Sequence, residues 1–412
     1  MVHPAPGQAG TNTWGDGVDA ALAAFPAANL TGTVDDARLP GSAQAATLAA
    51  TYGRLRNFDL QAYGAVGDGT TNDVVAINAA ITAAEAAGGG KVVAPNDKTY
   101  GVLTTIAMKS NVVLDGVRLK DLTGNTSIVS LADCADATVQ NCHLTGSGIL
   151  GMAGRGAVWG SMGASIGPTR CKIINNTIDS VGTGGVVMDH ATDCIISGNI
   201  IHRPVEHGVY ISTLSTDVQI FGNQIIDAGY GGVSTVEGVK LANSVVNAHV
   251  HGNIITNALA DGIVFESGVA DCSAIGNTVR LCGYIGIRVN VGATDVTIDG
   301  NKVLDNVGVG IRCIGGTTIK ISNNKVRANG PSCIQTDSGT TAVDISHNQL
   351  SQVGGYAIEL TATGATIMGN TGDAGYCSVV RATSTGVLVA QPNGGNTNSA
   401  GAGCLSVSYT LV

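Results

Sequence analysis

The chain has 412 residues, of which 59 are glycine, and only 12% are charged and 4% aromatic. Its formal net charge of −9 argues against nucleic acid as a partner, because no basic face is expected. No apolar run approaches the roughly 18 residues of a membrane span, so we expect no transmembrane segment.

Residues 1–57 form a leader rich in Ala, Pro and Gly that lacks the repeat found further on. The first residues, Met-Val-His-Pro-Ala-Pro-Gly, have neither the basic nor the apolar region of a signal peptide. We therefore expect synthesis in a reducing host cytoplasm, which suits unpaired cysteines. The segment Asn29–Pro40 and the motif Thr13-Trp14-Gly15 resemble parts of bacteriophage tail fibre and tailspike proteins. That resemblance implies an attachment segment for phage tail or baseplate proteins, and the alternative is a disordered leader.

Residues 72–87 are predicted to form a helix just before the repeats. Gly67-Asp68-Gly69 makes a tight turn, and Thr71, Asn72 or Asp73 can cap the N-terminus of a helix. Such a helix would cover the open end of a solenoid, whose terminal repeats need caps. We therefore interpret Asp68 and Asp73 as structural residues. The apolar stripe of the helix is Val74, Ile77, Ala80, Ile81 and Ala84.

An asparagine recurs along the chain at intervals of about 24 residues, mostly within phrases such as Ile-Ser-Gly-Asn-Ile-Ile (196–201). A second phrase, such as Gly-Val-Tyr-Ile (208–211), starts nine residues after most of these asparagines. Self-similarity at this period indicates a solenoid, a propeller or an array. The recurring residues are Asn141, Asn176, Asn199, Asn223, Asn253, Asn277, Asn301, Asn324, Asn348 and Asn370.

The repeat is too short for a propeller blade, which needs roughly 40 residues, but it is long enough for one coil of a parallel β-helix. Short segments alternate apolar and polar residues between Gly, Asn, Asp and Thr, which is typical of strands and turns. The recurring Asn would stack at the same corner of each coil and form a hydrogen-bonded ladder along the axis. Asn also tolerates the left-handed backbone of a tight corner.

The run from Ala62 to Asp73, the apolar helix and the segment Gly88–Pro95 together resemble the opening element of the pectate-lyase-like superfamily of right-handed β-helices. Phage tailspikes and alginate epimerases share that fold. The expected fold is therefore all-β: a right-handed, single-stranded parallel β-helix of ~24-residue coils over residues 58–375, with an N-terminal capping helix.

Three cysteines, Cys171, Cys194 and Cys272, each lie five residues before a recurring Asn. This position is expected to face the core, where free cysteine behaves as a small hydrophobe. Cys134 and Cys142 are the one pair that we consider for a disulfide. No Cys-x-x-Cys pair occurs, so we expect no zinc site and no cofactor, and the carboxylates leave calcium binding open.

Candidate site residues are expected on the outer face of one strand per coil, because side chains alternate inward and outward along a strand. Such a face can hold an extended polymer, since coils repeat on the scale of a sugar unit. The first outward column is Val187, Tyr210, Ser234, Val264, Arg288, Arg312, Gln335 and Glu359. The second outward column is Asp189, Ser212, Val236, Glu266, Asn290, Ile314, Asp337 and Thr361.

The first candidate cluster combines histidines, acids and tyrosines. Such groups suit proton abstraction next to a sugar carboxylate, with Arg neutralising the charge. The motif Gly185–His190 is similar to the Asp and His of alginate epimerases and lyases, without the aromatic residue that those enzymes place before them. The alternative is a solvated polar face. Its candidate catalytic residues are Asp189, His202, His207 and Glu266, and its candidate substrate-binding residues are Arg203, Glu206 and Tyr210, with Asp227, Tyr230 and Asp261 nearby.

The interval between Asn223 and Asn253 is 30 residues, which inserts about six residues around Glu237–Ser244. Insertions in solenoids map to loops on one face, often the binding face. This loop is therefore expected to wall the first cluster.

The second candidate cluster is rich in arginine and acids. Arg288 and Arg312 fall in one column on adjacent coils, about 5 Å apart, and stacked like charges are destabilising unless acids or a bound anion neutralise them. Asp337 and Glu359 are candidate catalytic acids of a retaining or inverting glycosidase, and the alternative is that they balance the arginines. The candidate substrate-binding residues here are Tyr284, Arg288, Asn290 and Arg312.

Residues 376–412 lack the repeat but contain strand-like segments at 387–390 and 405–412. These strands are expected to close the far end of the solenoid or to pair between subunits. Tailspike rods are usually trimers, so the resemblance implies a homotrimer.

By resemblance, the sequence implies a phage or prophage tailspike of the virion tail that binds a bacterial surface polysaccharide and cleaves it, as a glycoside hydrolase or a lyase. One alternative is a free extracellular polysaccharide lyase or C5-epimerase that uses the histidine cluster. A second alternative is a non-catalytic receptor-binding or structural tail rod. The expected ligand in the first two cases is a polysaccharide.

Overall fold

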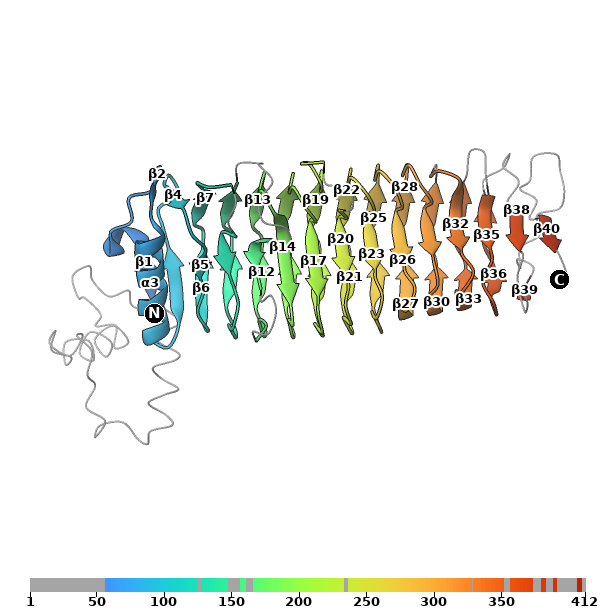
Figure 1. Ribbon diagram of the computed structural model, residues 1–412, viewed down its shortest axis with the longest axis horizontal. Helices are drawn as coiled ribbons and strands as arrows, with labels where there is room; N and C mark the ends of the chain where they lie inside the picture. Colours follow the sequence, from blue (N-terminus) through green and yellow to red (C-terminus); the bar gives the residue numbers. More distant parts are fainter. Residues whose placement is uncertain are drawn as a thin grey trace, which may run out of the picture. The chain divides into compact units, whose positions relative to one another are not determined.

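The computed structural model describes residues 56–372, apart from 125–126, 147–155, 161–165, 233–235, 328 and 352–355, and the strand backbones at 379–382, 388–390 and 406–409. The leader motifs, including Asn29–Pro40, lie outside the described residues. Successive coils add strands in turn to three parallel sheets, here called A, B and C, which run side by side along the solenoid (Figure 1).

The bounds of the strands are grouped here by sheet. Sheet A contains β1 (Asn57–Asp59), β3 (Gly90–Val93), β6 (Val112–Asp115), β9 (Thr138–Gln140), β12 (Lys172–Ile174), β15 (Ile195–Ser197), β18 (Gln219–Phe221), β21 (His249–His251), β24 (Ser273–Ile275), β27 (Thr294–Asp299), β30 (Thr317–Ser322), β33 (Thr341–Ser346), β36 (Thr366–Met368) and β39 (Leu388–Ala390). Sheet B contains β2 (Asp68–Asn72), β4 (Thr99–Val102), β7 (Arg118–Asp121), β10 (His143–Thr145), β13 (Thr177–Asp179), β16 (Ile200–His202), β19 (Gln224–Ile226), β22 (Ile254–Thr256), β25 (Thr278–Arg280), β28 (Lys302–Leu304), β31 (Lys325–Arg327), β34 (Gln349–Ser351) and β37 (Thr371–Gly372). Sheet C contains β5 (Ile106–Ala107), β8 (Val129–Ser130), β11 (Gly156–Trp159), β14 (Gly184–Asp189), β17 (Val209–Ser212), β20 (Val239–Leu241), β23 (Ile263–Phe265), β26 (Ile287–Val289), β29 (Ile311–Cys313), β32 (Ser332–Thr336), β35 (Tyr356–Leu360), β38 (Val379–Ala382) and β40 (Ser406–Tyr409).

The core lies inside the coils and is built from stacked aliphatic side chains. Ile196, Ile220 and Val250 are register partners on neighbouring strands of sheet A, and none of them is exposed. Each inward position repeats this stacking one coil further along, because parallel pairing aligns equivalent residues of the repeat. The predicted parallel β-helix of ~24-residue coils is therefore confirmed.

The asparagine ladder is a chain of buried side-chain amides at one corner. Nδ2 of Asn199 donates to Oδ1 of Asn223 at 2.9 Å and to the carbonyl oxygen of Ile173 at 2.9 Å. The backbone N–H of Asn199 donates to the same Oδ1 at 3.0 Å. Each member therefore satisfies buried backbone groups of the coils beside it. The ladder consists of Asn176, Asn199, Asn223, Asn253, Asn277, Asn301, Asn324, Asn348 and Asn370.

Two predictions about the ladder were wrong. Asn141 is not a member: its side chain is exposed and bonds Asp115, and Cys142 occupies the ladder position, where its N–H donates to Asn176. The left-handed residue of the corner is the one before the ladder Asn, for example Gly222 at φ +62° and Gly276 at φ +63°. Glycine adopts this backbone without the steric cost of a Cβ, which explains the recurring Gly-Asn pair.

The predicted helix is α3 (Val74–Ala86), and the predicted stripe of Val74, Ile77, Ala80, Ile81 and Ala84 is buried. It packs against β1, β3, β5 and β6, the first strands of sheets A and C (Figure 1). The carboxylate of Asp73 accepts hydrogen bonds from the N–H groups of Val66, Gly67 and Gly101 instead of capping the helix. Asp68 accepts from the N–H groups of Thr70 and Thr71, so backbone N–H groups hold both acids.

The cysteine positions follow the predicted frame. Cys171 and Cys194 are fully buried, and Cys272 is almost so. Cys134 and Cys142 are both free thiols. Burial raises the pKa of the Cys272 thiol to about 11, so this thiol stays protonated and apolar at neutral pH.

The insertion lies earlier than predicted. Its extra residues fall between Ile226 and Val239, whereas residues 239–241 form β20 in the middle of sheet C. Lys240 therefore occupies the outward column where Ser234 was expected, and Ser234 itself lies outside the described residues. In the second column Ala242, the residue after β20, takes the place of Val236.

The predicted C-terminal segments include strands that extend the sheets: β38 pairs with β35 and then with β40, and β39 pairs with β36, all in parallel. Among the residues that the structure describes, no helix is both long enough and apolar enough to cross a membrane.

Candidate functional site

The outer face of sheet C carries a row of aligned side chains, most of them polar. Tyr210, Lys240, Val264, Arg288 and Arg312 are register partners on β17, β20, β23, β26 and β29. They point outward because each is flanked by inward residues on its strand. The row continues through Gln335 and Glu359 on β32 and β35. Val264 is fully buried in the row, between the long side chains on either side.

A second row lies where the chain enters sheet C, two residues before each strand begins. His207, Glu237 and Asp261 hold this position on successive coils, before β17, β20 and β23. The N–H of Gly208 donates to the carbonyl of Glu237, and the N–H of Gly238 donates to that of Asp261, which fixes the alignment. An imidazole and two carboxyl groups are thus stacked beside the cations of the first row.

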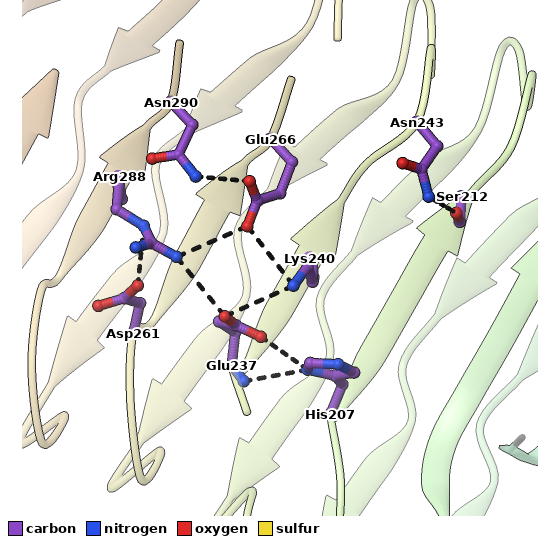
Figure 2. A network of polar contacts seen from close by, with 9 residues as sticks. All are labelled: His207, Ser212, Glu237, Lys240, Asn243, Asp261, Glu266, Arg288 and Asn290. Carbon is purple, nitrogen blue, oxygen red and sulfur yellow. Dashed lines mark hydrogen bonds and ion pairs between the residues drawn. The ribbon is translucent and has the colours of Figure 1, made fainter. Parts of the chain in front are cut away.

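Two cations join the acids into one network, which Figure 2 shows between β17 and β26. Nε of Arg288 lies 2.9 Å from Oδ2 of Asp261. Nη2 of Arg288 lies 3.6 Å from Oε1 of Glu237 and 3.6 Å from Oε1 of Glu266. Nζ of Lys240 lies 3.7 Å and 3.5 Å from the same two oxygens. Both cations are therefore placed between the two glutamates.

His207 is fixed by Glu237. The backbone N–H of Glu237 donates to Nδ1 of His207 at 3.1 Å, and Oε2 of Glu237 lies 2.8 Å from the same nitrogen. The ring centroids of His207 and Tyr210 are 5.1 Å apart. Nζ of Lys240 lies 5.8 Å from the centre of the Tyr210 ring. With Nδ1 engaged, Nε2 is the ring nitrogen left to meet a ligand.

Burial divides the network into buried and accessible members. The side chains of Glu237 and Asp261 are each 2% exposed, whereas Lys240 and Arg288 are each 19% exposed and Glu266 is 24% exposed. Burial raises the pKa of Asp261 to about 6, although Arg288 and the N–H of Ile285 favour the ionised form. The two buried acids therefore position the side chains that a ligand would touch.

The next coils carry the second predicted cluster. Nη2 of Arg312 lies 2.7 Å from Oδ2 of Asp337, and its Nε donates to the same oxygen at 3.1 Å. Burial lowers the pKa of Arg312, but the interactions with Asp337 and Tyr284 outweigh it and raise the pKa overall. Oε2 of Glu359 accepts a hydrogen bond from Ser332. Arg288 and Arg312 are register partners as predicted, and acids neutralise both.

The first predicted cluster is divided between different parts of the molecule. His202 lies on sheet B, where its Nδ1 is 3.0 Å from Asp179 and its Nε2 is 3.6 Å from Asp227. The grouping of His202 with His207 at one site was therefore wrong, because His202 lies on sheet B and His207 lies just before β17 of sheet C. Arg203 stacks on the ring of Tyr230 at 3.6 Å.

Asp189 is more buried than its place in an outward column suggests, at 8% exposed, and the predicted substrate-binding residue Glu206 is 7% exposed. Asp189 accepts a hydrogen bond from Thr213, and burial raises the pKa of its carboxyl. Asn290 donates to Oε2 of Glu266 at the edge of the network.

Glu237 and Lys240 were missed as site residues because two segments near the insertion match the strand phrase. Aligning Gly232-Val-Ser-Thr235 with that phrase placed Ser234 in the outward column. Gly238-Val-Lys-Leu241 matches the strand phrase of the other coils, as Gly208-Val-Tyr-Ile does. Choosing that phrase would have placed Lys240 beside Tyr210 and Glu237 beside His207.

In the part of the chain that the structure describes, no group of three or more His, Cys, Asp or Glu side chains is arranged to hold a metal ion. Calcium binding stays an untested prediction.

Comparisons with known proteins identify the fold. The sequence profile of the family described as right handed beta helix region matches residues 100–279 and 235–371. A search among curated protein sequences found no match.

Three similar solved structures share the fold at low sequence identity. The A-module of the Azotobacter vinelandii mannuronan C-5 epimerase AlgE4 is 16% identical, with a TM-score of 0.61, over 87% of this chain and 98% of that one. A variant of the periplasmic alginate epimerase AlgG is 14% identical, with a TM-score of 0.55, over 72% and 77%. The Dettilon tailspike protein is 19% identical, with a TM-score of 0.53, over 85% and 68%.

Proposed function

The chain belongs to the right-handed β-helix family, and from this premise we propose that it binds a bacterial surface polysaccharide along the outer face of sheet C and cleaves it in the manner of a tailspike. The observation that carries the proposal is the network in which Glu237 lies 2.8 Å from His207 and also contacts Lys240 and Arg288 (Figure 2). The ring of Tyr210 lies beside that of His207. The fold is shared with epimerases and tailspikes that are named for polysaccharide substrates or for phage tails.

The accessible side chains favour elimination over hydrolysis. A glycoside hydrolase needs two carboxyl groups at the scissile bond, but Glu237 and Asp261 are each 2% exposed, which leaves Glu266 as the accessible acid of the network. His207, Tyr210 and two cations are the groups that a lyase uses on a sugar carrying a carboxylate.

In the proposed reaction Tyr210 acts as the base and His207 acts as the acid. The deprotonated phenol oxygen of Tyr210 removes the proton from the carbon next to the carboxylate. Lys240 and Arg288 stabilise the negative charge that develops on that carboxylate. The bond to the leaving sugar oxygen breaks, and a carbon–carbon double bond remains in the product. Nε2–H of His207 donates a proton to that oxygen, because Nδ1 accepts the backbone N–H of Glu237 and leaves the proton on Nε2.

Glu266 competes with the substrate for the two cations. Its contacts with Lys240 and Arg288, at 3.5 Å and 3.6 Å, are longer than direct hydrogen bonds, whereas Asp261 holds Arg288 at 2.9 Å. A sugar carboxylate can therefore replace Glu266 without breaking the buried contact that orients Arg288.

The test is a panel of acidic and neutral bacterial polysaccharides, with products analysed by mass spectrometry and ultraviolet absorbance. Unsaturated fragments that disappear in His207→Gln and Tyr210→Phe, and persist in His251→Gln on sheet A, are the expected result. Each loss should be about a hundredfold or more in rate. Binding without fragments would leave a receptor-binding spike and overturn the cleavage.

Hydrolysis at Asp337 and Glu359 is the second candidate, because these acids lie on adjacent coils and both are partly exposed. Fragments carrying an added water, lost in Asp337→Asn and Glu359→Gln, would favour it over elimination.

The place in the virion tail, the homotrimer and the attachment through residues 1–57 are part of the same proposal. They are supported by the leader motifs and by the tailspike among the similar structures. An extracellular enzyme with the same chemistry is the alternative, supported by the epimerases. Electron microscopy of the purified chain and of virions labelled with an antibody would separate the two.

A further inference from the structure

A hollow of about 230 Å³ lies on the outer face of sheet A, on the first coils of the solenoid, and belongs to a different sheet from the candidate site. Small side chains line its floor, and polar side chains line its rim. The floor and rim include Gly90, Val113, Thr138, Asp136, Arg170 and Lys172.

The hollow follows from side-chain size along one row. Val113, Thr138 and Lys172 are register partners on β6, β9 and β12. Two short β-branched side chains are thus followed by a long one, and Gly90 adds no side chain beside them. Asp136 and Arg170 come two residues before Thr138 and Lys172, so their side chains border the same two coils.

The charges of the rim do not cancel. Arg170 makes a forked contact with Asp136, through Nε to Oδ1 at 2.9 Å and Nη2 to Oδ2 at 2.8 Å. Lys172 has no acid within ion-pair distance among the described residues. One positive charge therefore remains at a hollow that also offers a hydroxyl group and a carboxylate as hydrogen-bond partners.

We propose that this hollow is a second glycan-binding site, which takes one acidic sugar residue. The methyl groups of Val113 and Thr138 suit the C–H face of a sugar ring, and Asp136 and the hydroxyl of Thr138 accept or donate hydrogen bonds to its hydroxyl groups. Lys172 and the outer nitrogen of Arg170 bind its carboxylate. The volume is below the roughly 300–1,000 Å³ of drug-sized pockets, which fits a single residue of a polymer.

The polymer itself rests on the proposed function, but the site lies on a different sheet and is tested without cleavage. Its role is to hold the chain of sugars while the face of sheet C acts on another part of it. Two weak sites on one polymer raise the overall affinity through effective concentration.

The experiment is ligand-observed NMR of the full chain with sodium glucuronate, with methyl glucoside as the neutral comparison and acetate as the plain carboxylate. Lys172→Gln removes the charge, and Val113→Phe fills the hollow without changing charge. Lys320→Gln is the matched control, because Lys320 is an exposed lysine further along the same row of sheet A. Thermal unfolding checks that each variant is folded.

We expect glucuronate to bind more tightly than either comparison molecule, and to bind about tenfold more weakly in Lys172→Gln and in Val113→Phe. Lys320→Gln should bind as the parent does. Absence of glucuronate binding, equal binding of acetate, or binding that is lost in His207→Gln but kept in Lys172→Gln would overturn the proposal. None of these outcomes depends on whether any polysaccharide is cleaved.

Discussion

Arg288 and Arg312 are direct register partners on β26 and β29, yet their guanidinium groups turn in opposite directions along the solenoid. Arg288 reaches back to Asp261 on the preceding coil, at 2.9 Å, and Arg312 reaches forward to Asp337 on the following coil, at 2.7 Å. Each cation thus has its own acid, and the repulsion expected of stacked like charges is removed. Because the two arginines turn apart, Arg288 joins the network around His207, whereas Arg312 pairs with Asp337 outside that network.

The first prediction concerns that divergence. Asp337→Asn leaves Arg312 without its anion beside Arg288, so the free energy of unfolding should fall by about 1 kcal/mol. The double variant Arg312→Gln with Asp337→Asn should recover part of the loss. Urea unfolding of the parent, both single variants and the double variant measures the coupling. Asp305→Asn, at an exposed corner, is the control, and an equal effect there would contradict the ion-pair argument.

The second prediction compares the middle and the end of the asparagine ladder. Asn277→Ala leaves the backbone N–H and side-chain amide of Asn253, and the carbonyl of Val250, without their partner. Unsatisfied buried groups cost about 1–3 kcal/mol each, so the loss should be about 3 kcal/mol or more. Asn370→Ala, at the last ladder position, should cost less because Asn370 is 8% exposed, whereas Asn277 is fully buried. Urea unfolding measures the two losses, and hydrogen exchange shows which coils lose protection. Equal losses of free energy of unfolding at both positions would contradict the explanation by unsatisfied buried groups.

The repeat made the fold predictable, because each coil restates the same strand, corner and ladder pattern. The same periodicity placed Arg288 beside Arg312 correctly. It failed at Asn141, where Asn marks the left-handed corner and Cys142 takes the ladder position. An Asn is compatible with both positions, so the residue type alone could not decide between them.

The candidate site was harder to predict because it depends on which sheet each residue joins. His202 and His207 are five residues apart, but a corner separates them, so one lies on sheet B and the other beside sheet C. The insertion then shifted the alignment by about six residues and hid Lys240. Outward position was a poor guide to exposure for Val264, which its neighbours cover.

The third prediction is a pH dependence at Asp261. Its pKa rises from 3.8 to about 6 on folding, mainly through burial, so the folded chain keeps a proton that the unfolded chain loses between these values. The contribution of Asp261 to stability therefore falls as the pH rises from about 4 to about 6. The difference in free energy of unfolding between Asp261→Asn and the parent should shift in favour of the variant over that range.

Asp68 is a control for this pH dependence, because its pKa is shifted in the opposite direction. Hydrogen bonds from the backbone of Thr71 and Thr70 lower the pKa of its carboxyl, so its contribution is present above the ordinary Asp range and is lost at lower pH. Asp68→Asn should therefore lose stability relative to the parent as the pH rises. Unfolding curves for the two variants that move in the same direction would contradict the assignment of burial as the cause at Asp261.

The last prediction tests whether the ligand of sheet C is acidic. Glu266→Gln removes a negative charge that Lys240 and Arg288 contact at 3.5 Å and 3.6 Å, so both cations become available to a sugar carboxylate. An acidic polysaccharide should then bind about threefold more tightly at low salt, and the gain should shrink as salt is added. A neutral polysaccharide should bind no more tightly. Asp271→Asn is the control for net charge, because it removes a negative charge at an exposed corner next to sheet A. An equal gain in affinity in this variant would show that the overall charge of the protein attracts the polysaccharide, and would contradict competition between Glu266 and the sugar carboxylate.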